Sequence, residues 1–204
     1  MDDDMMKIFP LLFMLLFSVQ SNSSTLLILG DSLSAGYQMP IEQSWPALLG
    51  EQLKRLDTPT TVVNGSISGD TTGNGLARLP ALLAQYKPST VLIELGANDG
   101  LRGFPVKTII TNIEQIISLI KAQNSQVILL QIKIPPNYGK RYTEAFSSLY
   151  PQLSERNNLP LLPFFLEPLM QKPQLLMKDG LHPTVKAQPW IAQFMAKELA
   201  PYLK

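Results

Sequence analysis

The chain contains no cysteine, and it has a single histidine, His182, among its 204 residues. The lack of cysteine excludes disulfide bonds, iron–sulfur clusters, cysteine-ligated zinc and a thiolate nucleophile. A single histidine excludes a multi-histidine metal site and leaves His182 as the one imidazole that could act as a general base. Catalysis by this chain therefore has to rely on hydroxyl, carboxylate and amide groups together with one imidazole.

Charge of either sign is also scarce. Seventeen Lys and Arg residues face 16 Asp and Glu, a formal net charge of +1. This balance gives no electrostatic reason to expect a nucleic acid or an acidic membrane surface as partner. With 45% hydrophobic residues the chain can still build a buried core, and it carries too little charge for disorder. We expect one globular domain that works as a monomer on a small molecule.

The one long hydrophobic run lies near the amino terminus. Residues 8–17 read IFPLLFMLLF, with Lys7 before them and a small, polar run at 18–24. About 20 apolar residues are needed to span a bilayer, so this run predicts no stable membrane span. Its length matches the apolar centre of an export signal, which predicts a signal peptide at residues 1–23 and a mature domain at 24–204. A buried first helix is the alternative.

The three aspartates at positions 2–4 do not fit an export signal, which carries positive charge before its apolar run. Translation that begins at Met5 or Met6 would remove them and leave a typical signal. N-terminal sequencing of a secretion-blocked precursor would contradict this later start if it found Asp2.

Apolar runs alternate with amphipathic stretches along the rest of the chain. Short apolar runs predict buried strands at 26–29, 60–63, 91–95, 127–132 and 161–162. Apolar residues spaced by three and four predict helices at 44–56, 76–83, 106–120, 142–157 and 190–199. We expect Ser44 to be the N-cap of the first helix, and Pro151 to kink the fourth or end it early. The alternation predicts an α/β fold with a parallel sheet covered on both faces.

Polar clusters follow the first three predicted strands, and a fourth lies near the carboxyl terminus. They read GDSLS at 30–34, GSISGDT at 65–71, GANDG at 96–100 and DGLHP at 179–183. Each alone is typical of an ordinary loop. Ligands of such sheets bind at the carboxyl ends of the strands, where these clusters and the irregular segment 133–141 should meet. Together the clusters supply the groups that acyl transfer requires.

The roles follow from what acyl transfer needs. Ser32, where the first strand turns toward a helix, is the candidate nucleophile, and His182 is the base that activates it. Asp179, three residues before His182, can orient the imidazole across a tight turn. The oxyanion would be bound by the backbone amides of Ser32 and Gly69 and by the side-chain NH2 of Asn98.

Other readings of these clusters have less support. Asp31 and Asp99 could be metal ligands, but neither has a histidine or a second carboxylate in phase, so we expect loop hydrogen bonding and no metal. The glycines at 69–75 match neither phosphate-binding pattern, and we expect no cofactor. The G-x-S-x-G elbow of the α/β-hydrolases is absent as well.

At this point the four clusters resemble a known family. GDSLSAGY at 30–37, SISGDT at 66–71, GANDG and DGLHP resemble the sequence blocks of the SGNH subgroup of GDSL hydrolases, in order and over the whole mature chain. The resemblance implies a three-layer α/β/α, flavodoxin-like fold with a five-stranded parallel sheet. By resemblance, Ser32 is the nucleophile and Gly69 and Asn98 are oxyanion donors. Asp179 and His182 are the remaining members of the catalytic triad. It also implies that residues 100–104 line an acyl pocket.

The resemblance implies a periplasmic serine esterase that cleaves carboxylic esters and thioesters through an acyl-Ser32 intermediate. Lysophospholipids, acyl thioesters and aryl esters are the expected substrates. A carbohydrate O-acetylesterase of the same fold is one alternative, and it would cleave acetyl esters but not long acyl chains. A non-catalytic acyl-chain carrier is another, and a flavodoxin-type cofactor binder, which would be coloured, is a third.

Overall fold

A five-stranded parallel sheet organises residues 24–203, the part of the chain that the computed structural model describes. The strand order is β2-β1-β3-β4-β5, and every neighbouring pair is parallel. The strands are β1 (Ser24–Gly30), β2 (Thr60–Asn64), β3 (Thr90–Glu94), β4 (Gln126–Leu130) and β5 (Leu161–Leu162). All five predicted strands are present. The expected signal peptide, its possible starts and the alternative first helix lie outside the described residues.

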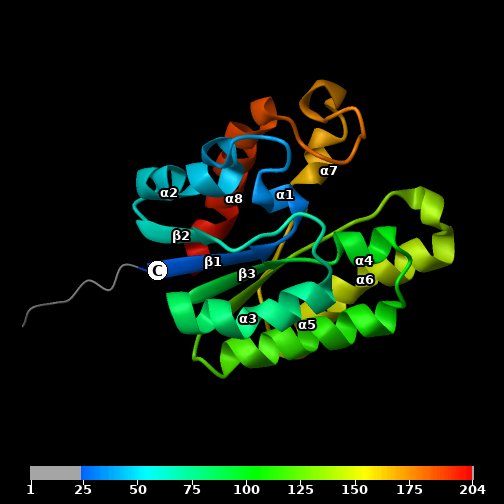
Figure 1. Ribbon diagram of the computed structural model, residues 1–204, viewed down its shortest axis with the longest axis horizontal. Coiled ribbons are helices and arrows are strands. Elements are labelled where there is room, and N and C mark those ends of the chain that lie inside the picture. Colours follow the sequence, from blue (N-terminus) through cyan, green and yellow to red (C-terminus); the bar gives the residue numbers. More distant parts are fainter. Residues whose placement is uncertain (1–23, 204) are drawn as a thin grey trace, which may run out of the picture.

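Helices cover both faces of this sheet, which confirms the three-layer α/β/α architecture (Figure 1). On one face lie α2 (Trp45–Arg55) and α8 (Gln188–Leu199), and on the other α3 (Thr72–Tyr86), α5 (Val106–Lys121) and α6 (Lys140–Asn157). Three short helices are α1 (Ser32–Ala35), α4 (Ala97–Leu101) and α7 (Leu166–Leu169). Single 3-10 turns are η1 (Ile41–Gln43), η2 (Pro136–Tyr138), η3 (Pro173–Leu175), η4 (Val185–Ala187) and η5 (Ala200–Tyr202). None of the helices described between residues 24 and 203 has the length and apolar character to cross a membrane.

The neighbouring strands β1 and β3 are buried along most of their length. Residues 26–29 of β1 and 91–93 of β3 have no exposed surface, which explains why these strands read as continuous apolar runs. Trp45, the first residue of α2, links α2 to α1 and α8 by hydrogen bonds. Its ring N–H donates to the Leu33 carbonyl of α1 at 3.1 Å, and its backbone N–H donates to Gln188 Oε1 of α8 at 2.9 Å. The short helix that begins at Ser32 is therefore anchored to two long ones.

The start of α2 is as predicted, and the start of α3 is not. Ser44 is the N-cap residue of α2, although its hydroxyl donates to the Ile41 carbonyl at 2.6 Å and makes no cap hydrogen bond. Helix α3 begins at Thr72 rather than at residue 76, because Thr71 and Asn74 form a capping box at its start. Gly75 lies within this first turn and packs tightly against Leu95, so a side chain there would collide with the Leu95 methyl group.

Of the two outcomes predicted for Pro151, the early end of α6 is wrong, because the helix runs on to Asn157 with Pro151 inside it. A proline within a helix leaves the carbonyl four residues earlier without its helical donor, here that of Ser147. Gln131, just after β4, donates its side-chain NH2 to the Ser147 carbonyl at 3.2 Å. A tertiary hydrogen bond thus replaces the helical one.

Candidate active site

Ser32 is the first residue of α1, immediately after the carboxyl end of β1. Asp31 is the N-cap of this helix, and its Oδ1 accepts the Leu33 backbone N–H at 3.0 Å. The cap places the Ser32 side chain at the cavity described below, where its hydroxyl is partly exposed. The sharp strand-to-helix turn that the GDSLS motif predicts is therefore present, and it directs the hydroxyl toward the carboxyl edge of the sheet.

His182 and Asp179 reach Ser32 from the other end of the chain. His182 Nε2 lies 2.9 Å from Ser32 Oγ, and His182 Nδ1 lies 2.7 Å from Asp179 Oδ2. An ionised carboxylate can only accept, so Nδ1 carries the hydrogen and donates it to Asp179. The unprotonated Nε2 of the neutral ring then accepts the Ser32 hydroxyl hydrogen. This is the arrangement that a serine nucleophile and its base require.

The tight turn at residues 179–182 keeps the Asp179 carboxylate ionised. Burial raises the pKa of Asp179, but the backbone N–H groups of His182 and Leu181 and the His182 ring outweigh it, so the pKa lies below its ordinary value. The imidazole is held on its other side as well, because the Tyr37 ring stacks on it with centroids 4.3 Å apart. Tyr37 could not be identified as a site residue from the sequence, because a lone tyrosine after a loop motif does not indicate a ring contact with a distant histidine.

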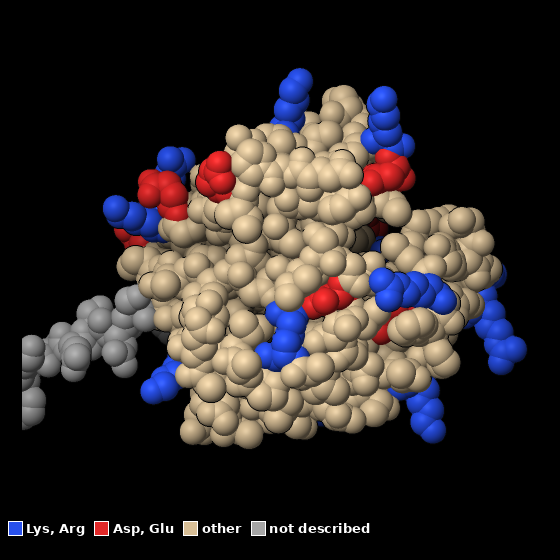
Figure 2. All heavy atoms as spheres, in the orientation of Figure 1, with Lys and Arg blue, Asp and Glu red and all other residues tan. Residues whose placement is uncertain are grey.

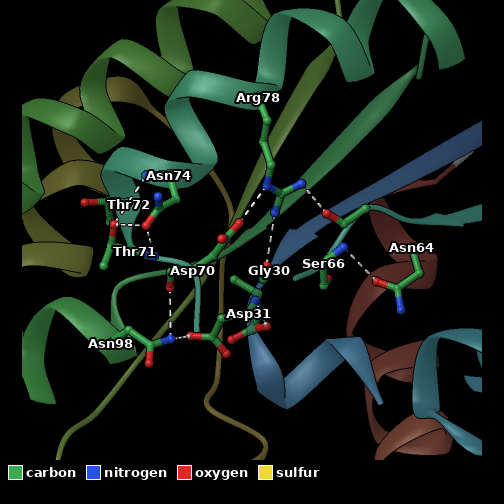
Figure 3. A network of polar contacts seen from close by, with 12 residues as sticks. Gly30, Asp31, Asn64, Ser66, Asp70, Thr71, Thr72, Asn74, Arg78 and Asn98 are labelled. Atoms are coloured by element: carbon green, nitrogen blue, oxygen red, sulfur yellow. Dashed lines mark hydrogen bonds and ion pairs between the residues drawn. The ribbon is translucent and has the colours of Figure 1, made fainter. Parts of the chain in front are cut away.

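The three expected oxyanion donors line the same cavity as His182. Gly69 has a φ of +86°, a conformation that favours glycine, in the loop before α3. Asn98 lies in α4, and both hydrogens of its NH2 have partners in this structure. Nδ2 donates to Asp70 O at 2.9 Å and to Asp31 Oδ2 at 3.1 Å (Figure 3). To bind an oxyanion, Asn98 would have to share one of these two NH2 hydrogens between its present acceptor and the oxyanion.

A mainly apolar cavity of about 240 Å³ opens beside Ser32. In the space-filling view the surface is hollowed on the right, between the regions of α7 and α4 (Figure 2). Of the expected pocket segment 100–104, Leu101 lines the cavity, and of the expected wall 133–141 the first three residues do. The other apolar lining residues include Leu33, Ala97, Phe164, Leu166 and Leu181. This lining suits an acyl chain rather than a sugar, which would need many polar partners.

Two carboxyl groups, of Asp31 and Glu94, are completely buried next to Ser32. Glu94 Oε2 accepts the Asp31 backbone N–H at 3.2 Å and the Ser34 hydroxyl at 2.6 Å. Burial raises the pKa of Asp31 to about 7, helped by the charges of Asp70 and Asp99, and it raises the pKa of Glu94 well above its ordinary range. Asp31 and Asp99 accept hydrogen bonds from the loops around them, as predicted from the sequence. Asp99 accepts from the Thr72 backbone N–H and hydroxyl.

Because Asp31 keeps its proton in the folded state up to a pH of about 7, and an unfolded aspartate loses it near 3.8, stability should fall as the pH rises between these values. Below this window both states are protonated, and above it both are ionised. We expect Asp31→Asn to remove this fall. Relative to the wild type, the free energy of unfolding of the variant should rise by up to roughly 4 kcal/mol between pH 4 and pH 8. Urea unfolding at several pH values measures it, with the exposed Asp57→Asn as control. Parallel pH curves for wild type and Asp31→Asn would contradict the expectation.

Comparison with known proteins adds independent information. The model of the GDSL-like lipase/acylhydrolase family matches residues 28–188. The chain is 59% identical over 192 residues to an arylesterase of Vibrio mimicus, covering 94% of this chain and 96% of that protein. It is 52% identical over 193 residues to thioesterase 1/protease 1/lysophospholipase L1 of Escherichia coli K12, covering 94% and 91%. The crystal structure of the esterase EstA from Pseudoalteromonas sp., inhibited by monoethylphosphonate, superimposes with a TM-score of 0.85 at 46% identity, covering 89% and 99%.

Proposed function

Because the chain belongs to the GDSL-like lipase/acylhydrolase family, we propose that it hydrolyses its substrate by acyl transfer through Ser32. It is an esterase and thioesterase of the lysophospholipase type, as its similarity to the arylesterase and to the thioesterase/lysophospholipase implies. The observation that carries the mechanism is the continuous contact from Asp179 through His182 to the Ser32 hydroxyl, at 2.7 and 2.9 Å.

In the first half of the reaction Ser32 Oγ attacks the carbonyl carbon of the ester or thioester, and its proton moves to His182 Nε2. The carbonyl oxygen becomes an oxyanion bound by the amides of Ser32 and Gly69 and by Asn98. When the tetrahedral intermediate collapses, His182 gives its proton to the departing alcohol or thiol. Ser32 is left carrying the acyl group.

In the second half a water molecule replaces the leaving group. His182 takes one proton from the water as it attacks the acyl carbon, and the same three donors bind the second oxyanion. Collapse releases the carboxylic acid, and the proton returns to Ser32 Oγ. The Asp179 carboxylate accepts from Nδ1 throughout, which stabilises the imidazolium in both halves.

The substrate class follows from the cavity beside Ser32. Its apolar lining favours acyl groups longer than acetyl, such as those of lysophospholipids and acyl thioesters. We propose aryl esters as a further substrate class, from which a phenol departs. We also propose that the enzyme acts in the periplasm after cleavage of residues 1–23. The apolar run at 8–17 supports this, and N-terminal sequencing of the mature protein tests it together with the start site.

Pre-steady-state hydrolysis of p-nitrophenyl esters tests this function. The purified protein should release p-nitrophenol in a burst of one equivalent per protein, followed by slower turnover, because acylation by this good leaving group outpaces hydrolysis of the acyl-enzyme. A series from acetate to palmitate should show higher kcat/KM for medium or long chains than for acetate. Activity confined to acetate and acetylated sugars would identify a carbohydrate O-acetylesterase instead. Tight binding of fatty acids without turnover would identify a carrier.

A further inference from the structure

Arg78 of α3 lies over the carboxyl ends of the two neighbouring strands β1 and β2, with its side chain four-fifths buried. Its Nε donates to Asp70 Oδ2 at 2.6 Å, its Nη1 donates to the Gly65 carbonyl, and its Nη2 donates to the Gly30 carbonyl at 3.3 Å (Figure 3). Each nitrogen of one planar guanidinium therefore holds a different segment of backbone or carboxylate. The catalytic steps described above do not use this side chain.

Two of the three residues that Arg78 binds, Gly30 and Asp70, lie beside oxyanion donors. Gly30 ends β1, two residues before Ser32. Asp70 directly follows Gly69, and its backbone carbonyl accepts the Asn98 side chain at 2.9 Å. The guanidinium thus binds one residue next to Gly69 and one residue two positions before Ser32, and it reaches Asn98 only through Asp70. Figure 3 shows the line of contacts from Arg78 through Asp70 to Asn98 and on to Asp31.

At Gly69 itself the loop has few contacts. No atom outside the neighbouring residues lies within 4 Å of the position that a Gly69 side chain would take, and Ile67 and Ser68 are exposed. The Gly69 carbonyl accepts one hydrogen bond from Arg102, an exposed side chain, at 3.2 Å. Beside Gly69 the loop is held by the buried ion pair between Asp70 and Arg78, together with the hydrogen bonds from Asn98 to the Asp70 carbonyl and from the Ile67 backbone N–H to the Gly30 carbonyl.

We propose that Arg78 is a positioning residue of the oxyanion hole, which holds the N–H groups of Gly69 and Asn98 at the spacing that a tetrahedral oxyanion requires. The inference rests on the proposed function, because an oxyanion forms only if Ser32 attacks an acyl group. Small displacements of such donors lower the rate strongly, since they act in the transition state. Lysine cannot replace arginine here, because an ammonium group lacks the rigid fork that reaches three acceptors.

The test compares Arg78→Met and Arg78→Lys with a matched control, Arg156→Met. Arg156 also lies on a long helix, with an ion pair to Glu114 at 3.2 Å and a hydrogen bond to Gln152, on a part of α6 that contributes nothing to the cavity. We expect both Arg78 variants to lower kcat by about 10- to 100-fold, short of the roughly 10²–10³ that loss of a whole donor costs, with KM changed less than about 3-fold. Arg156→Met should match the wild type.

Activity is expressed per functional site, counted by complete titration with a p-nitrophenyl phosphonate, so partial unfolding does not enter the comparison. Affinity for an alkylboronic acid, which forms a tetrahedral adduct on Ser32, should fall in proportion to kcat/KM. Affinity for the product fatty acid should stay unchanged, because it carries no tetrahedral centre. A purely structural role for Arg78 would reduce the number of sites while leaving kcat per site and boronate affinity intact, and that result would overturn the proposal.

Chemical rescue adds a test of geometry. In Arg78→Ala, added ethylguanidinium should restore part of the lost kcat, whereas ethylammonium, with the same charge but no fork, should not. Equal rescue by both cations would show that charge alone matters and would overturn the positioning role. Ser32→Ala separates the two levels of inference. If that variant still turns over, the proposed function fails, and if it is inactive while Arg78→Met equals the wild type, the inference about Arg78 alone fails.

Discussion

Replacement of Ser32 by alanine should lower kcat/KM for p-nitrophenyl esters by at least about 10⁴-fold and abolish the burst. The variant keeps the cavity, the oxyanion donors and the His182–Asp179 pair, so any residual rate measures what these contribute without a nucleophile. The protein should fold normally, because Ser32 Oγ makes its one described hydrogen bond to His182. Stopped-flow assays and intact mass after phosphonate treatment measure both effects.

The paired variants sharpen this expectation. His182→Ala should cost nearly as much as Ser32→Ala, and the double variant no more than the worse single one, because the two groups act as a unit. Ser118→Ala, on an exposed position of α5, serves as the control and should keep the full burst. A burst that survives in Ser32→Ala would show that another residue carries the acyl group.

Replacement of Asp179 by asparagine should lower kcat by about 10³–10⁴-fold. The reason lies in the two backbone N–H groups, of Leu181 and His182, that bind Asp179 Oδ1 at 2.9 and 3.0 Å. In Asp179→Asn these two N–H groups will bind the side-chain amide oxygen at the position of Oδ1. The asparagine NH2 then points toward His182 Nδ1. The imidazole must then accept at Nδ1 and carry its hydrogen on Nε2, so it can no longer take a proton from Ser32.

The imidazole tautomer should set an unusual order of activity among the Asp179 variants. Asp179→Ala leaves His182 free to adopt either tautomer, so it should be at least as active as Asp179→Asn, although asparagine is the closer replacement in shape. Nitrogen NMR of the labelled imidazole should show hydrogen on Nε2 in Asp179→Asn and on Nδ1 in the wild type. An Asp179→Asn protein clearly more active than Asp179→Ala would contradict the tautomer argument.

The sheet and its flanking helices could be predicted from sequence because their signals are local. The central strands are buried on both faces and read as unbroken apolar runs, and the isoleucines of α5 repeat through four turns. The first turn of α3 was missed because Gly73 and Gly75 lower helix propensity, although Thr71 and Asn74 provide a capping signal. The course of α6 past Pro151 depends on Gln131, a contact that no local pattern reveals.

The site divides in the same way. Five residues could be chosen because each stands in a polar cluster after a strand or before a proline. The structure brings Ser32, Gly69, Asn98 and His182 to one cavity and places Asp179 behind His182. Arg78 could not be chosen, because an arginine in an amphipathic helix is typical of a solvated face. Glu94 is the one charged residue of the predicted strand 91–95, and no local pattern reveals that its side chain is completely buried. Both depend on neighbours that are distant in sequence.

The separation of Ser32 from His182 has a consequence for biosynthesis. The nucleophile belongs to the first fifth of the chain, while the base and its aspartate lie in the last eighth, in a loop held by the bridge between Leu176 and Pro183. The ribosome makes His182 150 residues after Ser32, and the emerging polypeptide has no imidazole until then. On the proposed mechanism, a nascent chain that stops before His182 lacks the base that activates Ser32.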